Sequence, residues 1–264
     1  KMIKIDKRWA NIEYWKALGQ MVDPITFGYY LNAVDLKYDS NKNIVQQPKK
    51  RRIYNSTWLL TLEVSVLVTL FCLMLGYPIA YLLASLPLKY SNLLMICVLL
   101  PFWTSLLVRT VSWIVILMQK GVFNSVLVWA GIIADENRMQ LIYNKTGTII
   151  AMTQILLPFM VLPLYSVMKT ISPNYMRAAL NLGAKPMNAF YKIYMPQTVP
   201  GISAGGLLVF VLAIGYFITP ELVGGSEGLL IGHFIAYHLK TTLNWGLCSA
   251  LGTILLTAML LLYW

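Results

Sequence analysis

Charged residues are scarce in this chain, and their scarcity excludes an ordinary soluble domain. Only 12% of the 264 residues are charged, whereas 58% are hydrophobic. A typical soluble domain has about 25% charged and about 45–50% apolar residues. The net charge of +11 does not indicate a nucleic-acid-binding surface, because the basic residues gather near the N-terminus and in loops between apolar runs. The composition therefore predicts a membrane protein.

The motifs of common catalytic and metal sites are also missing. The sequence contains no GxxxxGK[ST], so this chain cannot hold ATP phosphates in a P-loop, and it contains no HExxH. Its two histidines, His233 and His238, are five residues apart and do not share a helix face, so we expect no metal site. The three cysteines, Cys72, Cys97 and Cys248, lie in apolar segments without paired spacing, and we interpret them as small buried residues.

The sequence contains several long apolar runs. A helix needs roughly 20 apolar residues to cross a bilayer. Five runs approach this length: 57–84, 92–118, 147–168, 197–219 and 244–264. The piece 121–134 is short and interrupted by glycine, so we expect an interfacial or re-entrant helix there, and an outer loop with a short helix at 220–243. The predicted fold class is an all-α polytopic membrane protein with about five transmembrane helices in this chain.

Residues 1–56 contain no run that could span a membrane, and we expect an extracytoplasmic segment before a transmembrane domain at 57–264. Apolar residues in 9–22 recur at helical spacing, which predicts an amphipathic helix. Residues 34–47 are expected to form two short extended pieces around a turn at Asp39. The basic cluster Lys49–Arg52 conflicts with an outer location, since such clusters usually mark the cytoplasm. We expect acidic residues of a partner to meet these charges.

A polar island at 171–201 separates two apolar runs, and the rest of the chain is organised around it. Ser172–Pro173 is a strong helix start, because serine caps the first turn and proline suits the first helical position. Gly183 is expected to end this helix, since glycine tolerates a left-handed stop. Pro186 is placed to open a second short helix, and the prolines within 196–200 mark the start of the next span.

The charge of this island predicts its side of the membrane. Basic residues are enriched in cytoplasmic loops. The island and its entrance carry only basic charges, at Lys169, Arg177, Lys185 and Lys192. We therefore expect a bent pair of short helices at the cytoplasmic face, with one span on each side.

The island resembles the EAA loop in permease subunits of bacterial binding-protein-dependent ABC importers. The family pattern is Glu-Ala-Ala, then a glycine, then an apolar residue and a proline. The matching positions are Arg177, Ala178, Ala179, Gly183, Ile193 and Pro196, with arginine in place of the family's glutamate. The flanking stretches 101–110, 157–165 and 217–225 look like the spermidine/putrescine-type branch, and the resemblance covers roughly residues 57–264.

This resemblance implies a type I ABC importer permease in the bacterial inner membrane, with one more membrane helix before residue 1. It implies that a separate nucleotide-binding subunit binds ATP and Mg²⁺, with no cofactor in this chain. A second permease subunit, an external binding protein and membrane lipid would be its partners, and nucleic acid would not. It also implies that the loop 171–196 docks on the ATPase through Arg177, Ala178, Ala179, Gly183, Ala184, Lys185 and Pro186.

Two ionisable residues lie inside apolar runs, where each costs roughly 2.5–3.5 kcal/mol on insertion scales and so needs a reason. Glu63 is about six residues inside the first run and Arg109 is about nine residues from the end of the second, which gives similar depths of roughly 9 and 13 Å. The two could pair. The pair would either support packing or line the route of the substrate.

A second group of candidates surrounds the expected end of the run 197–219. Glu221 follows Pro220, where we expect the helix to break, and backbone breaks at membrane depth face protein or a water-filled cavity. Together with Gly224 and Gly225, this suggests a bend at the mouth of a pathway; a loop cap without a ligand is the alternative. Aromatic rings can hold an organic cation by cation–π contact. The candidates are Trp103, Tyr216 and Phe217.

The resemblance indicates a polyamine substrate, although the long segment 1–56 leaves a different small organic solute open. Two other classes of function remain as alternatives: an ion-coupled secondary carrier and a polytopic membrane enzyme. Neither has its expected signature, since chains of intramembrane carboxylates and paired interfacial acids or histidines are both missing. Finally, Gly201, Gly205 and Gly206 predict close approach between helices.

Overall fold

The computed structural model describes residue 15 and residues 26–39 and 42–263. The described residues form two compact units: the part up to Leu59 together with Phe234–Leu262, and Leu60–His233. The amphipathic helix expected at 9–22 lies outside the described residues, apart from Trp15.

The first unit contains a small hairpin. Its elements are α3 (Gly28–Asn32), β1 (Leu36–Tyr38), β2 (Ile44–Gln46) and η2 (Lys49–Arg51). The strands are antiparallel, with Leu36 opposite Gln46, and the amide of Asp39 donates to the carbonyl of Asn43 at 2.8 Å. The prediction of two extended pieces is confirmed, while residues 40 and 41 of the expected turn lie outside the described residues.

Asp35 caps the long helix that follows this hairpin. Its carboxylate accepts hydrogen bonds from the amides of Ile53, Tyr54 and Asn55 at distances of 2.8–3.1 Å. The first amides of a helix have no partner inside the helix, so a buried carboxylate there satisfies groups that would otherwise be unpaired. Asp35 is only 3% exposed. Sequence reasoning missed this cap, because Asp35 is 18–20 residues away from its partners.

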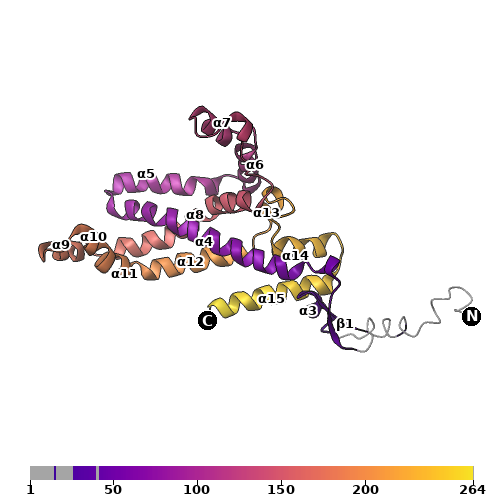
Figure 1. The fold of residues 1–264 in the computed structure, drawn as a ribbon. Coiled ribbons are helices and arrows are strands. Elements are labelled where there is room, and N and C mark those ends of the chain that lie inside the picture. Colours follow the sequence, from indigo (N-terminus) through magenta and orange to yellow (C-terminus); the bar gives the residue numbers. More distant parts are fainter. Residues whose placement is uncertain (1–14, 16–25, 40–41, 264) are drawn as a thin grey trace, which may run out of the picture. The chain divides into compact units, whose positions relative to one another are not determined.

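Helices make up the rest of the described chain. They are α4 (Tyr54–Ser85), α5 (Leu88–Leu99), η3 (Leu100–Trp103), α6 (Leu106–Leu117), α7 (Val122–Trp129), η4 (Asp135–Asn137), α8 (Lys145–Thr170), α9 (Asn174–Asn181), α10 (Pro186–Ala189), η5 (Phe190–Tyr194), α11 (Met195–Gln197), α12 (Val199–Ile214), α13 (Ile218–Val223), α14 (Ile231–Lys240) and α15 (Trp245–Tyr263). In the second unit, α5, α8, α12 and the unit's part of α4 run along one another, and α6 and α7 stand out from this bundle (Figure 1).

Among the described residues, four helical segments are long and apolar enough to cross a membrane: Tyr54–Ser85, Leu106–Trp129 (α6 and α7 taken together), Lys145–Thr170 and Trp245–Leu262. The bent pair Pro186–Gln197 and Val199–Ile214 adds a fifth candidate. The expected single span at 92–118 is wrong, because α5 ends in the turn η3 and a new helix begins at Leu106. Pro101 has no amide proton to continue the helix, and Thr104 is extended with a ψ of 146°.

Helices α8 and α12 pack closely in the second unit. A Cβ on Gly201 would lie 3.1 Å from the Cβ of Val167, and one on Gly205 would lie 2.9 Å from the Sδ of Met160. A Cβ on Gly206 would meet nothing nearer than 3.9 Å. The predicted close approach is therefore confirmed for Gly201 and Gly205, while Gly206 has free space.

Candidate functional site

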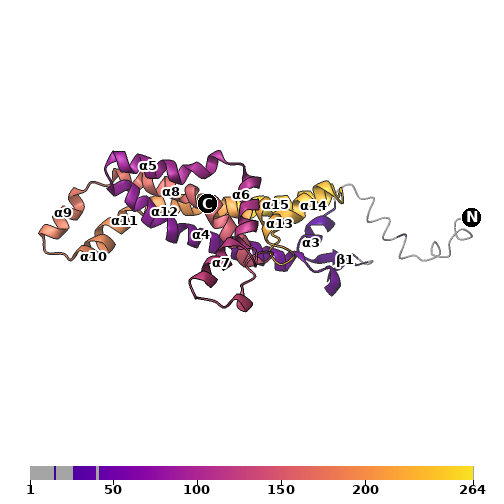
Figure 2. The ribbon, with the colours of Figure 1, turned by 90° about the horizontal axis from the view of Figure 1, so that it is seen from above.

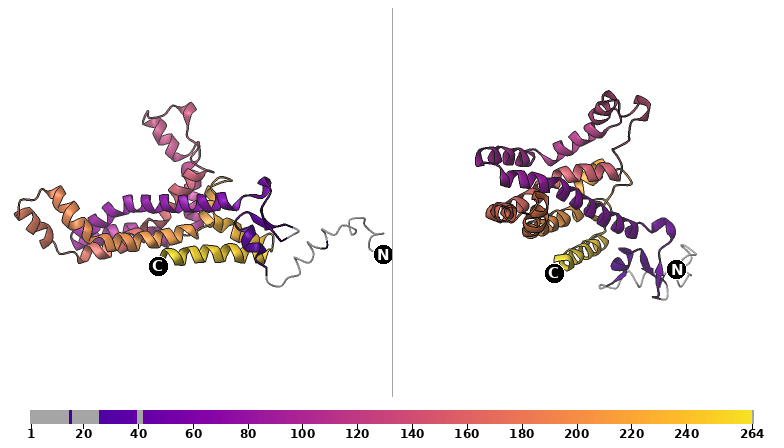
Figure 3. Two further views of the ribbon diagram at one scale, coloured as in Figure 1. Left: turned by 60° about the horizontal axis from the view of Figure 1, so that its bottom comes forward. Right: turned by 60° about the vertical axis from the view of Figure 1, so that its left-hand side comes forward.

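The polar island folds into an elbow of short helices, α9 to α11, between α8 and α12. Figure 2 and the left view in Figure 3 show the elbow at one end of the second unit, beyond the ends of α8 and α12. The helix Pro186–Gln197 meets Val199–Ile214 at a bend of 60°. Pro186 stands in the first turn of α10, as the sequence predicts.

Gly183 makes the turn between the two arms of the elbow. Its φ of +85° lies in the left-handed region, which glycine adopts without the steric penalty of a side chain. Its amide donates to the carbonyl of Leu180 at 3.0 Å, and the amide of Ala184 donates to the carbonyl of Ala179 at 3.0 Å. These bonds satisfy carbonyls at the end of α9, so the predicted glycine stop is confirmed.

The expected docking residues differ in exposure. Arg177, Ala178, Lys185 and Pro186 are exposed, whereas Ala179 is buried. Buried Ala179 supports the packing of α9 inside the elbow, so a substitution at Ala178 is the cleaner test of a docking surface. Beside Arg177, a cavity of about 330 Å³ is lined by residues of α9 and of the end of α4.

The proposed pairing of Glu63 with Arg109 does not occur in this structure. Glu63 forms an ion pair with Lys145, the first residue of α8. Arg109 lies in the first turn of α6 and donates to the carbonyls of Pro101 and Thr104. It therefore stabilises the break between η3 and α6, a break that the sequence prediction did not include.

Arg109 instead lies beside residues near the start of α13. Tyr216, which precedes α13, lies near the side chains of Thr219 and Arg109. The Thr110 and Thr219 hydroxyl oxygens are 3.3 Å apart, which links α6 to α13. Among the described residues, Trp103 makes no hydrogen bond or ring contact with Arg109, Tyr216 or Thr219, and it is 90% exposed.

The expected helix break before Glu221 occurs earlier in the chain. Helix α12 ends at Ile214, and Pro220 lies inside the next helix, α13, where its missing amide costs little in the first turn. Glu221 is half-exposed, with its Oε1 3.8 Å from the Nδ1 of His233. Phe217 is half-buried at the break.

A tight glycine turn follows α13; the sequence predicted a bend at Gly224 and Gly225, but not the contact of this turn with α8. A Cβ on Gly224 or Gly228 would lie 2.6 or 2.7 Å from the Oγ1 of Thr148 on α8. Gly225 has a φ of +57°, and a Cβ there would lie 2.6 Å from the carbonyl oxygen of Tyr143. In the sequence, three glycines within five residues are the feature that indicates a tight turn at this point. This turn holds the segment after Glu221 against the start of α8.

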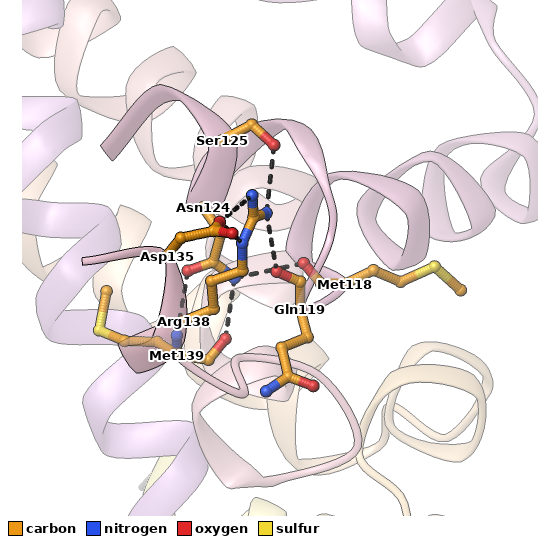
Figure 4. A network of polar contacts seen from close by, with 7 residues as sticks. All are labelled: Met118, Gln119, Asn124, Ser125, Asp135, Arg138 and Met139. Atoms are coloured by element: carbon orange, nitrogen blue, oxygen red, sulfur yellow. Dashed lines mark hydrogen bonds and ion pairs between the residues drawn. The ribbon is translucent and has the colours of Figure 1, made fainter. Parts of the chain in front are cut away.

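The loop that contains α7 is held by a compact polar network (Figure 4). The side-chain amide of Asn124 donates from Nδ2 to the carbonyl of Met139 at 2.8 Å. Its Oδ1 accepts from the backbone amide of Met139 at 3.1 Å. Arg138 pairs with Asp135 at 2.7 Å and donates to the carbonyl of Gln119 at 3.3 Å. Asn124 is fully buried, so this short apolar piece has a defined fold, with α7 at its centre.

The elbow between two spans and the helical bundle define a class of membrane transport subunit. Residues 76–264 match the family described as "Binding-protein-dependent transport system inner membrane component". The chain belongs to this family and is a multi-pass permease subunit of an inner-membrane ABC importer that works with a binding protein.

Two relatives with the same printed name are similar to most of this chain. The chain is 39% identical over 215 residues to the Spermidine/putrescine transport system permease protein PotB of Escherichia coli (strain K12), covering 80% of this chain and 78% of that protein. It is 36% identical over 207 residues to the protein of the same name from Haemophilus influenzae, covering 77% and 72%.

A solved structure shows the same fold. It is a bacterial alginate ABC transporter in complex with an alginate pentasaccharide-bound periplasmic protein, with a TM-score of 0.66 and 18% identity. The match covers 98% of this chain and 89% of the other. The predicted all-α importer-permease fold is confirmed.

Proposed function

We propose that this chain forms one half of a pathway that ATP hydrolysis in separate subunits opens and closes. The observation that carries this proposal is the elbow α9–α11, whose two ends continue into α8 and α12. A nucleotide-binding subunit that grips the elbow from the cytoplasm would tilt both spans together. In this scheme that subunit binds ATP and Mg²⁺, a second permease subunit completes the pathway, and an external binding protein delivers the substrate.

The exposed surface of the elbow suits such a partner. Leu182, Met187 and Tyr175 are 89%, 65% and 55% exposed, although they lie in the polar segment between two spans. Burying one side chain of this kind contributes about 1.5–3 kcal/mol. No aspartate or glutamate occurs in residues 137–220, so every charged side chain of the elbow is cationic. Its receiving groove is therefore expected to be apolar at the centre and not basic at the rim.

Ala178→Asp is expected to reduce co-purification of the nucleotide-binding subunit by about tenfold, because it places an unpaired carboxylate in the interface. The matched control is Ala130→Asp, which makes the same change at an exposed alanine after α7. Equal ATPase retention in both variants would contradict the docking proposal. Uptake by this chain alone on an ion gradient, without ATP, would favour a secondary carrier instead.

For the substrate, we propose a polyamine. The relatives named for spermidine and putrescine transport support this class. Glu221 on α13 offers a half-exposed carboxylate, and the half-buried rings of Tyr216 and Phe217 precede it by five and four residues. Glu63 already has a cationic partner in Lys145, so a substrate ammonium would have to displace that lysine to reach it. Arg109 and Trp103 complete the proposed pathway set.

Glu221→Gln is expected to slow ATP-driven spermidine uptake by roughly twofold to fivefold, the range for losing one exposed ion pair. The substitution keeps the shape of the side chain and removes only its charge. Uptake into proteoliposomes that contain the whole assembly measures this effect. Glu227→Gln, an exposed glutamate six residues further along, is the control. Equal uptake in both variants would remove Glu221 from the pathway.

A further inference from the structure

We propose that the elbow drives a third membrane helix, α4, in addition to α8 and α12. The link is an aromatic clamp made of Tyr77 and Tyr81 on α4 and Phe190 and Tyr194 on η5. This inference rests on the proposed function, because it assigns the clamp a part in transmitting the ATPase stroke.

The rings of the clamp form a continuous set of contacts. Phe190 makes edge-to-face contacts with Tyr77 at 6.2 Å and with Tyr81 at 5.6 Å between ring centroids. Tyr81 also meets Tyr194 edge-to-face at 5.4 Å, and Phe190 stacks on Tyr194 at 5.6 Å with an interplanar angle of 20°. These are the favoured geometries of aromatic pairs. Several contacts between the same two elements resist sliding better than one contact does.

A hydrogen bond places the clamp at the hinge of the elbow. Thr198 is fully buried and stands between the two helices that meet at 60°. Its hydroxyl lies 3.2 Å from the hydroxyl of Tyr77 and donates to the carbonyl of Met195 at 2.7 Å. Helix α4 therefore contacts both the η5 arm and the residue at which that arm bends into α12.

Two backbone features allow the clamped part of α4 to move as a lever. Pro78 lies between the two tyrosines and removes the helical hydrogen bond to the carbonyl of Met74, which weakens α4 at that point. On the other side of the clamp, Phe190–Tyr194 is a π-helix, a rare geometry that is often found at functional sites. The clamp thus joins the π-helical arm of the elbow to α4 on both sides of Pro78.

The lever also carries α5 with it. The hydroxyl of Ser91, which is buried, donates to the carbonyl of Leu83 at 2.7 Å and closes the hairpin between α4 and α5. A displacement of the elbow would therefore reach α4 and α5 directly through the clamp. The rings that contact Tyr77 and Tyr81 belong to η5, so η5 is the arm that transmits the stroke.

The first test measures the spermidine imported per ATP hydrolysed by the reconstituted assembly with its binding protein. Tyr81→Ala removes two edge-to-face pairs and is expected to lower this ratio by about tenfold while the nucleotide-binding subunits stay bound. Tyr81→Phe keeps the ring and is expected to behave as wild type. Tyr90→Ala, at an exposed tyrosine on α5, is the control and should not change the ratio.

The second test asks whether α4 and η5 move as one body. Tyr77→Cys on α4 and Tyr191→Cys on η5, where Tyr191 is 56% exposed, are joined by a short bismaleimide after Cys97 and Cys248 have been replaced by serine; Cys72 is buried. The same double variant without cross-linking is the reference. The cross-linked assembly is expected to retain uptake, because the clamp does not open in the cycle. Loss of uptake on cross-linking, or an unchanged ratio in Tyr81→Ala, would overturn the proposal.

The outcomes also separate this inference from the proposed function. If Tyr81→Ala releases the nucleotide-binding subunits, the clamp only folds the elbow and the inference fails, while the importer function stands. If the wild-type assembly takes up spermidine without hydrolysing ATP, the proposed function itself fails.

Discussion

Gly183→Pro is expected to release the nucleotide-binding subunit from the complex, with retention falling by about tenfold or more. Proline fixes φ near −65°, whereas this position has a φ of +85°. The substitution also removes the amide that donates to the carbonyl of Leu180 at 3.0 Å. The elbow would then have to open or bend elsewhere, so its two arms would no longer present one docking surface. Co-purification from membranes measures the effect.

Two further variants at this position separate backbone geometry from side-chain size. No atom lies within 4 Å of a Cβ built on Gly183, so added volume alone is harmless. Gly183→Asn should retain most of the ATPase, because asparagine tolerates the left-handed region. Gly183→Ala should be intermediate, since left-handed backbone costs such a residue about 1–2 kcal/mol. Wild-type retention in Gly183→Pro would show that the turn does not position the docking surface.

Gly205→Val is expected to destabilise the permease by about 1–3 kcal/mol, the usual cost of overpacking a close contact. Its Cβ alone would lie 2.9 Å from the Sδ of Met160 and 3.1 Å from the carbonyl oxygen of the same residue. The thioether can move, but the backbone carbonyl of α8 cannot. The variant should give a lower midpoint of thermal unfolding in detergent and a smaller monodisperse fraction.

The neighbouring glycine provides the matched control for that experiment. Gly206 is on the same helix and receives the same substitution, but its Cβ would lie 3.9 Å from the nearest atom, the Cγ2 of Thr69. Gly206→Val should therefore keep nearly wild-type stability. If both variants lose stability equally, helix propensity rather than the contact between α8 and α12 is responsible.

The elbow could be predicted from the sequence because its determinants are local. A proline opens a helix and a glycine ends one through their own backbone chemistry, so Pro186 and Gly183 marked the two arms correctly. The hairpin around Asp39 was predictable for a similar reason. Neither required knowledge of a residue distant in the chain.

The second span could not be predicted correctly, because composition alone does not separate one apolar helix from two. Residues 92–118 are mostly apolar, yet the chain turns at Pro101 and starts a new helix at Leu106. The arrangement that stabilises this break depends on Arg109 reaching back to two carbonyls. The same lack of tertiary information led to the wrong partner for Glu63, which pairs with Lys145 at a distance of 82 residues along the chain.

By itself, the sequence determined the membrane class, most of the spans and the elbow between α8 and α12, because apolar runs, prolines and glycines act on their own neighbourhood. Tertiary structure alone decided the capping of α4 by Asp35, the partner of Glu63 and the aromatic clamp at the elbow. Tyr77 and Thr198 are 121 residues apart, and no local pattern specifies that their hydroxyls meet. Such contacts arise only when separate helices pack, since packing chooses among many partners of similar chemistry.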